Sequence, residues 1–180
     1  MLTESDLSAF LASPVPVVAV TARHAGVRNA MAAGWSMPLS MTPPLYGVQV
    51  GKERGTHPLI TGSGEFGVNF LPLARARTVH GAGSFHLYDG VDKYARVPLT
   101  EHPDAPLALA EAFLHYTCRV VNVVETGDHD LFVGEVVRVL RDPEFYDAQG
   151  VFRGSAALHN GRGLYVGSGQ ERLAFPKDRY

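Results

Sequence analysis

Apolar residues occur in short runs along this chain, and glycine, proline or charged residues separate the runs. The stretch VPVVAVTAR (15–23) is dense in valine, and residues 45–50 and 65–71 have a similar character. Because β-branched residues are typical of strands, we expect a strand at each of these places. Two longer runs, 115–126 and 131–142, predict a pair of long strands joined by the turn Gly-Asp-His-Asp.

Two other segments have a weaker strand pattern. NAMAAGWSMPLSMTPP (29–44) is apolar, uncharged and rich in small residues, and it predicts a second strand or an extended loop that stops at its two prolines. GLYVG (163–167) predicts a short strand near the end of the chain. The glycine of HAGVR, between the first two of these strands, indicates a turn.

Helical patterns are few and short. Thr3, with Asp6 three residues later, resembles an N-cap with its acidic partner and predicts a short helix before the first strand. Another short helix is expected from about Thr56, and some helix around 74–79. Many strands with turn residues between them, and no regular alternation of strand and helix, favour an antiparallel β-barrel with peripheral helices. We expect one domain over 1–180.

Composition and charge exclude several classes of function. The chain has 180 residues, 46% of them hydrophobic, which suffices for one ordinary core. A formal charge of -2 gives no electrostatic basis for binding nucleic acid or an anionic membrane. The acidic N-terminus does not resemble a signal peptide, and no apolar run is long enough for a membrane helix. We therefore expect a soluble cytoplasmic protein.

Common catalytic motifs are absent from the sequence. The glycines of 161–169 lack the spacing of a dinucleotide-binding loop, and those of 62–67 lack the lysine and hydroxyl residue of a P-loop, so both predict turns. There is no zinc-protease motif and no pair of cysteines, so we expect no metal site. There is also no nucleophile elbow, so hydrolytic chemistry has no support in the sequence. Cys118, the single cysteine, lies in a strand pattern and is interpreted as a small buried hydrophobe.

The segment GKERGTHPLI (51–60) carries the residue types that bind a phosphate. Lys52 and Arg54 supply positive charge, and Thr56 supplies a hydroxyl at the start of the expected helix. Backbone N–H groups at a helix N-terminus together with nearby cations suit an anion. A capped helix with two solvated charges is the alternative, and this segment alone does not decide between them.

The small residues of 29–44 add a second feature. Without bulky side chains, a flat ring can approach the backbone closely and form hydrogen bonds with it. Ser36 and Ser40 would bring hydroxyls within reach of a phosphate. An uncharged wall beside a cationic helix start suits a ligand with a flat aromatic end and an anionic end.

Several segments, in this order and spacing, resemble the flavin reductase-like family of FMN-binding split barrels, which includes flavoredoxins and the small reductases of two-component monooxygenases. They are VPVVAVTA, NAMAAGWSMPLSMTPPLYGVQV, GTHPLITGSGEFGVNFL, SFHLYDGVDKYA, ETGDHDLFVGEVV and LYVGSG. The resemblance covers about 14–166. It implies a six-stranded antiparallel Greek-key split β-barrel and a homodimer that binds FMN non-covalently near the interface, with FAD less favoured.

The resemblance also implies a set of cofactor contacts. The flavin-ring wall falls on 29–36, and the residues concerned there are Asn29, Ala30, Met31, Trp35 and Ser36. The phosphate site falls on Ser36, Lys52, Arg54 and Thr56, with Ser40 close by. His86 and Lys93 are further candidates for contact with flavin or pyridine nucleotide. Where many members have serine this chain has Gly55, so one hydroxyl contact to phosphate is expected to be missing.

The resemblance implies an NAD(P)H:flavin oxidoreductase in which the nicotinamide passes hydride to the flavin, so that the cofactors carry the chemistry. The family associates the Gly-Asp-His turn with the nicotinamide, which makes His129 the candidate there, supported by Asp128. The alternative is that His129 ties the turn down through its acidic neighbours.

Three functions remain open from the sequence. The first is a reductase that supplies reduced FMN to a partner oxygenase. The second is a flavoredoxin-like electron carrier that a redox protein feeds in place of NAD(P)H. The third is a flavin-binding module without turnover. The choice between NADH and NADPH depends on a cation for the 2′-phosphate, which the sequence does not locate.

Overall fold

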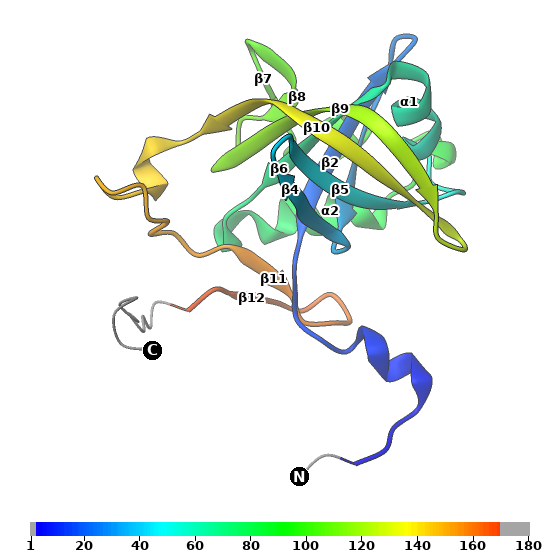
Figure 1. The fold of residues 1–180 in the computed structure, drawn as a ribbon, viewed down its shortest axis with the longest axis vertical. Helices are drawn as coiled ribbons and strands as arrows, with labels where there is room; N and C mark the ends of the chain where they lie inside the picture. Colours follow the sequence, from blue (N-terminus) through cyan, green and yellow to red (C-terminus); the bar gives the residue numbers. More distant parts are fainter. Residues whose placement is uncertain (1–2, 170–180) are drawn as a thin grey trace.

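The centre of the protein is a seven-stranded antiparallel sheet in a computed structural model that describes residues 3–169. Its strands, in chain order, are β2 (Val18–His24), β3 (Val27–Ala33), β4 (Ser36–Met41), β5 (Pro44–Gly51), β6 (Glu65–Phe70), β9 (Leu114–Glu125) and β10 (His129–Arg141). The spatial order is β3-β2-β6-β9-β10-β5-β4. β3 and β4 are the two edges of the sheet although they follow each other in the chain. Figure 1 shows the two long strands β9 and β10 lying side by side and curving across the sheet.

This architecture confirms the expected antiparallel split barrel with peripheral helices, but the main sheet has seven strands where six were expected. The difference arises in 29–44, for which a strand or a loop was predicted. The segment holds most of β3, the whole of β4 and the first residue of β5, with Gly34 and Trp35 between β3 and β4. The turn between the two long strands is also shorter than expected, because His129 and Asp130 already belong to β10.

The barrel core is built from residues that alternate along the strands, as half-buried strands require. Val18 and Val20 of β2, Val48 of β5, Phe66 of β6 and Phe132 of β10 are fully buried and belong to one cluster. Cys118 lies in the same cluster, as predicted, and burial raises the pKa of its thiol to about 12.

Short helices and two small sheets surround the barrel. The helices are η1 (Leu7–Leu11), α1 (Thr56–Ser63), η2 (Leu73–Arg75), α2 (Ala76–Ser84), η3 (Leu87–Asp89), α3 (Lys93–Arg96) and η4 (Pro143–Phe145). One small sheet contains β1 (Val15–Pro16), β11 (Ala157–His159) and β12 (Tyr165–Gly167), and the other contains β7 (Glu101–His102) and β8 (Ala105–Leu109). The helices expected near Thr3, Thr56 and 74–79 are thus present, the first as the 3-10 helix η1.

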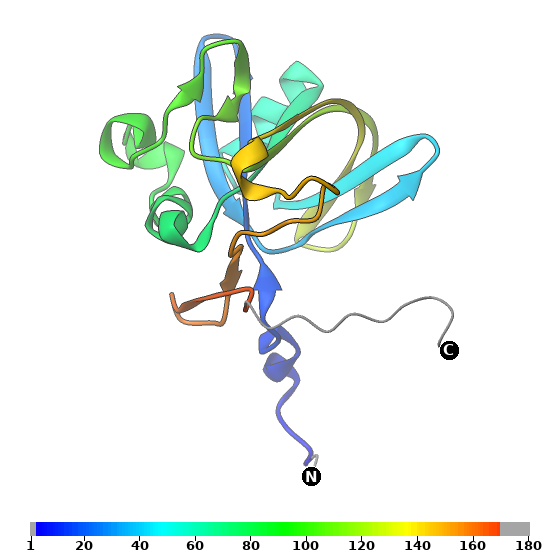
Figure 2. The ribbon, with the colours of Figure 1, turned by 90° about the vertical axis from the view of Figure 1, so that its left-hand side faces the viewer.

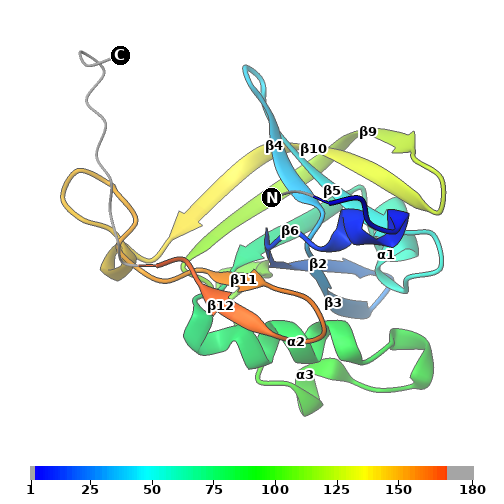
Figure 3. The same cartoon turned by 90° about the horizontal axis from the view of Figure 1, so that it is seen from below.

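The side of the barrel that carries β3 is covered by α2, and α3 lies beyond it (Figure 3). Val79 and Ala82 of α2 pack with Ala30 of β3 in a second buried cluster. Figure 2 shows η1 extending away from the barrel, and the β4–β5 hairpin projecting from its side. Among residues 3–169, no helix is both long and apolar enough to cross a membrane.

Candidate functional site

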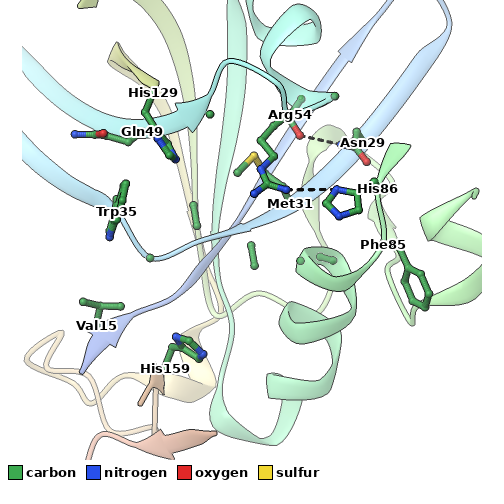
Figure 4. A pocket seen from close by; sticks show the side chains of 18 of the residues that line it. Val15, Asn29, Met31, Trp35, Gln49, Arg54, Phe85, His86, His129 and His159 are labelled. Atoms are coloured by element: carbon green, nitrogen blue, oxygen red, sulfur yellow. Dashed lines mark hydrogen bonds between the residues drawn. The ribbon is translucent and has the colours of Figure 1, made fainter. Parts of the chain in front are cut away.

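A cavity of about 450 Å³ opens where the sheet edge β3, the loop after β5 and the helices α2 and α3 meet. Its lining includes most of the residues that the sequence singled out. Those are Asn29, Met31, Trp35, Arg54, Thr56, His86, Lys93 and His129. Figure 4 shows that they enter from different segments, with Trp35 and His129 on one side and Asn29, Arg54 and His86 on the other.

One end of the cavity is formed by the start of α1. Thr56, the first residue of α1, is fully buried, and its hydroxyl accepts a hydrogen bond of 2.8 Å from Asn29 Nδ2. Among the described residues no side chain caps the helix. His57 N–H donates to Arg54 O over 2.8 Å and Pro58 has no N–H, so the N–H of Thr56 is the one in the first turn that can meet a ligand. Asn29 Oδ1 is buried and has no hydrogen-bond partner among the described residues. Because such groups are costly when unpaired, this end of the cavity is suited to a polar ligand.

Lys93, in the short helix α3, brings a buried cation to the same cavity. Only 5% of the residue is exposed, and Nζ donates hydrogen bonds to Ala30 O (2.7 Å) and Ala82 O (2.9 Å). Among the described residues, no carboxylate forms an ion pair with it. Burial, and secondarily the charge of Arg54, lowers the pKa of Lys93 to about 8. An ammonium without an acidic partner favours an anionic ligand.

Gly55 allows the loop before α1 to approach η3. A Cβ atom at position 55 would lie 2.7 Å from Leu87 Cβ, which is closer than packed atoms tolerate. The residue next to Leu87, His86, places Nδ1 3.4 Å from Arg54 Nη1, and the dashed line in Figure 4 marks this contact. Many family members have serine at the position of Gly55. In this chain a glycine is favoured there because Leu87 leaves no room for a Cβ atom.

The opposite side of the cavity carries an aromatic pair. The rings of Trp35 and His129 lie with centroids 4.9 Å apart and planes tilted by 51°. His129 Nδ1 is 2.8 Å from Asp128 Oδ1, which is exposed, and this contact lowers the pKa of the Asp128 carboxyl. Asp128 thus holds one ring nitrogen of His129. The imidazole ring of His129 faces the cavity beside Trp35 and Gln49 (Figure 4).

Five predicted site residues do not line the cavity. Ala30 is buried, and its carbonyl holds Lys93. Ser36 is 3.2 Å from the hydroxyl of Tyr46, and Ser40 lies in the β4–β5 hairpin, where it pairs with Leu45. Lys52 forms an ion pair with Glu125, and Asp128 contributes only through its contact with His129.

Other lining residues gave no signal in the sequence. Gln49 lies on β5, and His159, from β11, lines the cavity together with Phe10 and Leu11 of η1. These segments are up to about 150 positions apart, and only the packing of the small sheet beneath the barrel brings them together. Among the described residues, no group of three or more His, Cys, Asp or Glu side chains is arranged to hold a metal ion.

Comparison with known proteins adds to this geometry. A family model described as "Flavin reductase like domain" matches residues 10–161. The chain is 36% identical over 121 residues to the reductase component of a 4-nitrophenol 4-monooxygenase/4-nitrocatechol 2-monooxygenase from Rhodococcus opacus, covering 67% of this chain and 63% of that protein. It is 35% identical over 144 residues to an NADH:riboflavin 5′-phosphate oxidoreductase from Streptomyces pristinaespiralis, covering 74% of each. An NADH-dependent FAD reductase from Streptomyces globisporus is 32% identical over 132 residues, which are 72% of this chain and 71% of that protein.

Solved structures resemble the whole fold. An FMN-binding protein from Thermus thermophilus superposes with a TM-score of 0.84 and 31% identity, covering 97% of this chain and 98% of that one. A flavoredoxin from Methanosarcina acetivorans superposes with a TM-score of 0.82 and 27% identity, covering 98% and 96% of the two chains. The described barrel, including the elements that form the cavity, is therefore shared with these proteins.

Proposed function

Because the chain belongs to the family of flavin reductase-like domains, we propose that it transfers hydride from NAD(P)H to an FMN bound in the cavity between α1, α2 and β3. The named relatives from Streptomyces and Rhodococcus support a flavin reductase. The observation that carries the proposal is the cavity itself, which combines a cationic helix start with an uncharged wall of small residues.

The residues present fit such a cofactor. The N–H of Thr56 at the start of α1 and the side chains of Arg54 and Lys93 offer donors and positive charge to a phosphate. Asn29 Oδ1, buried without a partner among the described residues, offers an acceptor to a hydroxyl or a ring N–H. Ala32, Ala33 and Gly34 line the cavity with small or no side chains, which suits the close approach of a flat ring. The cofactor, when bound, supplies the hydride-accepting chemistry.

The protein contributes binding and orientation. Trp35 and His129 form the wall of the cavity opposite Asn29 and His86 (Figure 4), and we assign them to the nicotinamide. Asp128 holds Nδ1 of His129, so Nε2 faces away from that contact. In this assignment His129 is a binding residue, and its loss raises KM for the nucleotide more than it lowers kcat.

FMN is proposed over FAD because two relatives point to it, the oxidoreductase for riboflavin 5′-phosphate and the FMN-binding protein from Thermus. The FAD reductase from Streptomyces globisporus supports the alternative. The relative from Rhodococcus, a reductase component, supports an oxygenase partner that receives reduced flavin. A homodimer is part of the proposal, since large apolar side chains such as Met41 and Val139 are exposed in the single chain.

A second candidate is electron transfer without NAD(P)H, which the similarity to the Methanosarcina flavoredoxin favours. Steady-state oxidation of NADH and NADPH in the presence of FMN, FAD or riboflavin distinguishes the two functions. We expect consumption of a nicotinamide nucleotide that depends on added FMN, with a higher KM in His129→Gln. No consumption above the rate without protein would contradict the reductase function and favour the carrier.

A further inference from the structure

A polar pair outside the cavity joins two of its walls. His57, the second residue of α1, lies with Nε2 2.8 Å from Asp130 Oδ2 on β10, and the two side chains are 20% and 16% exposed. The ring of His57 also packs edge-on against Phe132 of the barrel core, with centroids 5.0 Å apart. Neither His57 nor Asp130 lines the cavity, so the proposed function leaves this pair without a role.

The pair connects residues that neighbour the two ends of the cavity. His57 follows Thr56, at the end proposed for phosphate, and Asp130 follows His129, at the end proposed for the nicotinamide. The loop between β5 and α1 spans these ends. At its start Gly51 pairs with His129, and Lys52 N–H donates to Asp128 O over 3.1 Å. The His57–Asp130 contact fastens the far side of the same loop to the same strand.

Of the side-chain contacts across this region, the His57–Asp130 hydrogen bond is expected to be the strongest. Lys52 also reaches this region, but its ion pair with Glu125 is exposed, at 41% and 76%. Its distance to Asp130 is 3.9 Å, longer than a hydrogen bond. Exposed ion pairs contribute little, whereas a partly buried hydrogen bond to a carboxylate is less screened. This hydrogen bond therefore ties the start of α1 to β10.

We propose that His57 and Asp130 are positioning residues that couple the phosphate end of the cavity to His129. The inference rests on the proposed function. A phosphate held at the start of α1 favours one placement of His57, and through Asp130 this placement favours one placement of the neighbouring His129. Phosphate occupancy and nucleotide binding then support each other, as linkage between two sites requires.

The test is a cycle of two proteins and two flavins. Wild type and His57→Leu are each assayed with FMN and with riboflavin, which lacks the phosphate, and KM and kcat for NADH are measured. In wild type we expect KM for NADH to be lower with FMN than with riboflavin by about fivefold, the usual lower range of coupling between sites. In His57→Leu the two KM values become equal, while kcat changes less than KM.

Two variants serve as controls. His57→Gln keeps an N–H donor near the place of Nε2 and is expected to restore the dependence of KM on phosphate. Arg119→Gln breaks an exposed ion pair between β9 and Glu135, which lies on the same strand as Asp130, and leaves this dependence unchanged. If His57→Leu does not fold, Asp130→Asn removes the charge of the acceptor while keeping its shape, and the same cycle is run on it.

A second measurement needs no flavin. Amide hydrogen exchange of the Lys52 N–H is expected to be about tenfold faster in His57→Leu, since a charged hydrogen bond of this strength is lost. The Val68 N–H of β6, far from the loop, keeps its rate. The coupling is overturned if KM for NADH depends on the flavin phosphate to the same extent in wild type and in His57→Leu. It is also overturned if the Lys52 amide hydrogen exchanges at the same rate in both proteins. A wild type that binds no flavin would overturn the proposed function instead, and the exchange rates would still decide the structural connection.

Discussion

Lys93 carries a buried positive charge that has no acidic partner among the described residues, and its contacts are two backbone carbonyls. Such a residue is destabilising without a ligand of opposite charge. Only the family resemblance makes Lys93 a candidate before the structure is known. Its burial depends on the carbonyls of Ala30 and Ala82, which belong to β3 and α2, and no local pattern around α3 contains that information.

Replacing Lys93 tests its proposed contact with phosphate. Its pKa is about 8, so the ammonium is present below pH 8 and is lost as the pH rises. We expect the affinity of wild type for FMN to fall above pH 8, whereas its affinity for riboflavin stays constant. Lys93→Met is expected to bind FMN about tenfold more weakly at pH 7 and to lose this pH dependence, as removal of a charge-assisted contact predicts.

The measurement for Lys93 is the dissociation constant from quenching of flavin fluorescence between pH 7 and 10. The matched control is Lys52→Met, because Lys52 lies outside the cavity lining and pairs with Glu125. An equal loss of FMN affinity in both variants, or the same pH profile in wild type and Lys93→Met, would show that the buried ammonium does not contact the phosphate.

His115 is a second buried titratable residue, far from the cavity. Its Nδ1 is 2.9 Å from Asn69 Oδ1, which already accepts a hydrogen bond from Leu109 N–H, so Nδ1 must donate. Its Nε2 then accepts from the Thr117 hydroxyl, also over 2.9 Å. Burial, followed by the charges of Arg138 and His102, lowers the pKa of His115 to about 4. The neutral ring is thus the native form.

This arrangement predicts a loss of stability in acid. The unfolded chain, with a pKa near 6.5, binds a proton before the folded one does, so stability falls as the pH decreases from 6.5 to about 4. The shift corresponds to about 3 kcal/mol of the free energy of unfolding. Urea unfolding at pH 7 and at pH 4 measures it. In His115→Gln the difference between the two pH values is expected to be smaller by about that amount, and an unchanged difference would exclude His115 as the cause.

At the scale of elements, the contact between the loop before α1 and η3 fixes the shape of the phosphate end. Gly55→Ser would introduce the hydroxyl that many family members carry, but its Cβ would meet Leu87 at 2.7 Å. We expect Gly55→Ser to weaken FMN binding and to destabilise the protein by about 1–3 kcal/mol, the usual cost of overpacking. Thermal unfolding and FMN titration measure both effects.

A double substitution makes this prediction specific. Leu87→Gly removes the obstructing Cβ together with the rest of the side chain, so Gly55→Ser combined with Leu87→Gly should cost less than the sum of the two single substitutions. Strict additivity of the two costs would mean that the two positions do not contact each other, contrary to the structure. Leu87 belongs to a region for which the sequence predicted no regular element.

Element prediction succeeded where the pattern was strong and local. The valine-rich runs predicted β2, β9 and β10 within a few residues, since alternation along them reflects one buried face. The segment 29–44 was harder to interpret. Ala32 and Ala33 of β3 line the cavity, while Met37, Leu39 and Met41 of β4 are exposed, so the usual contrast between buried apolar and exposed polar positions is missing there.

At the scale of the whole molecule, the sequence could place the flavin wall and the start of α1 in one site only through the family resemblance. The participation of Phe10, Leu11 and His159 depends on the sheet of β1, β11 and β12 beneath the barrel, which local patterns did not predict. The same holds for His57, whose partner Asp130 is 73 positions away. Contacts between distant segments carry no local pattern.

The proposed homodimer is tested by sedimentation equilibrium. Apolar side chains exposed on β4, β9 and β10 predict a mass of twice 19.4 kDa. Val139→Glu, at a position that is 54% exposed in the single chain, should shift the protein toward the monomer if this surface is the interface. A monomer at all concentrations in wild type would contradict the dimer without affecting the assignment of the cavity.

The most direct test of the central claim is anaerobic reduction of the bound flavin. The purified protein is loaded with FMN, freed of excess flavin, and titrated separately with NADH and NADPH while its visible absorption is recorded. We expect at least one nucleotide to bleach the absorption of the oxidised flavin, and to do so more slowly at low nucleotide concentration in His129→Gln. Flavin that binds but is reduced by neither nucleotide, or a protein that retains no flavin, would contradict the assignment of the cavity as the site of a flavin reductase.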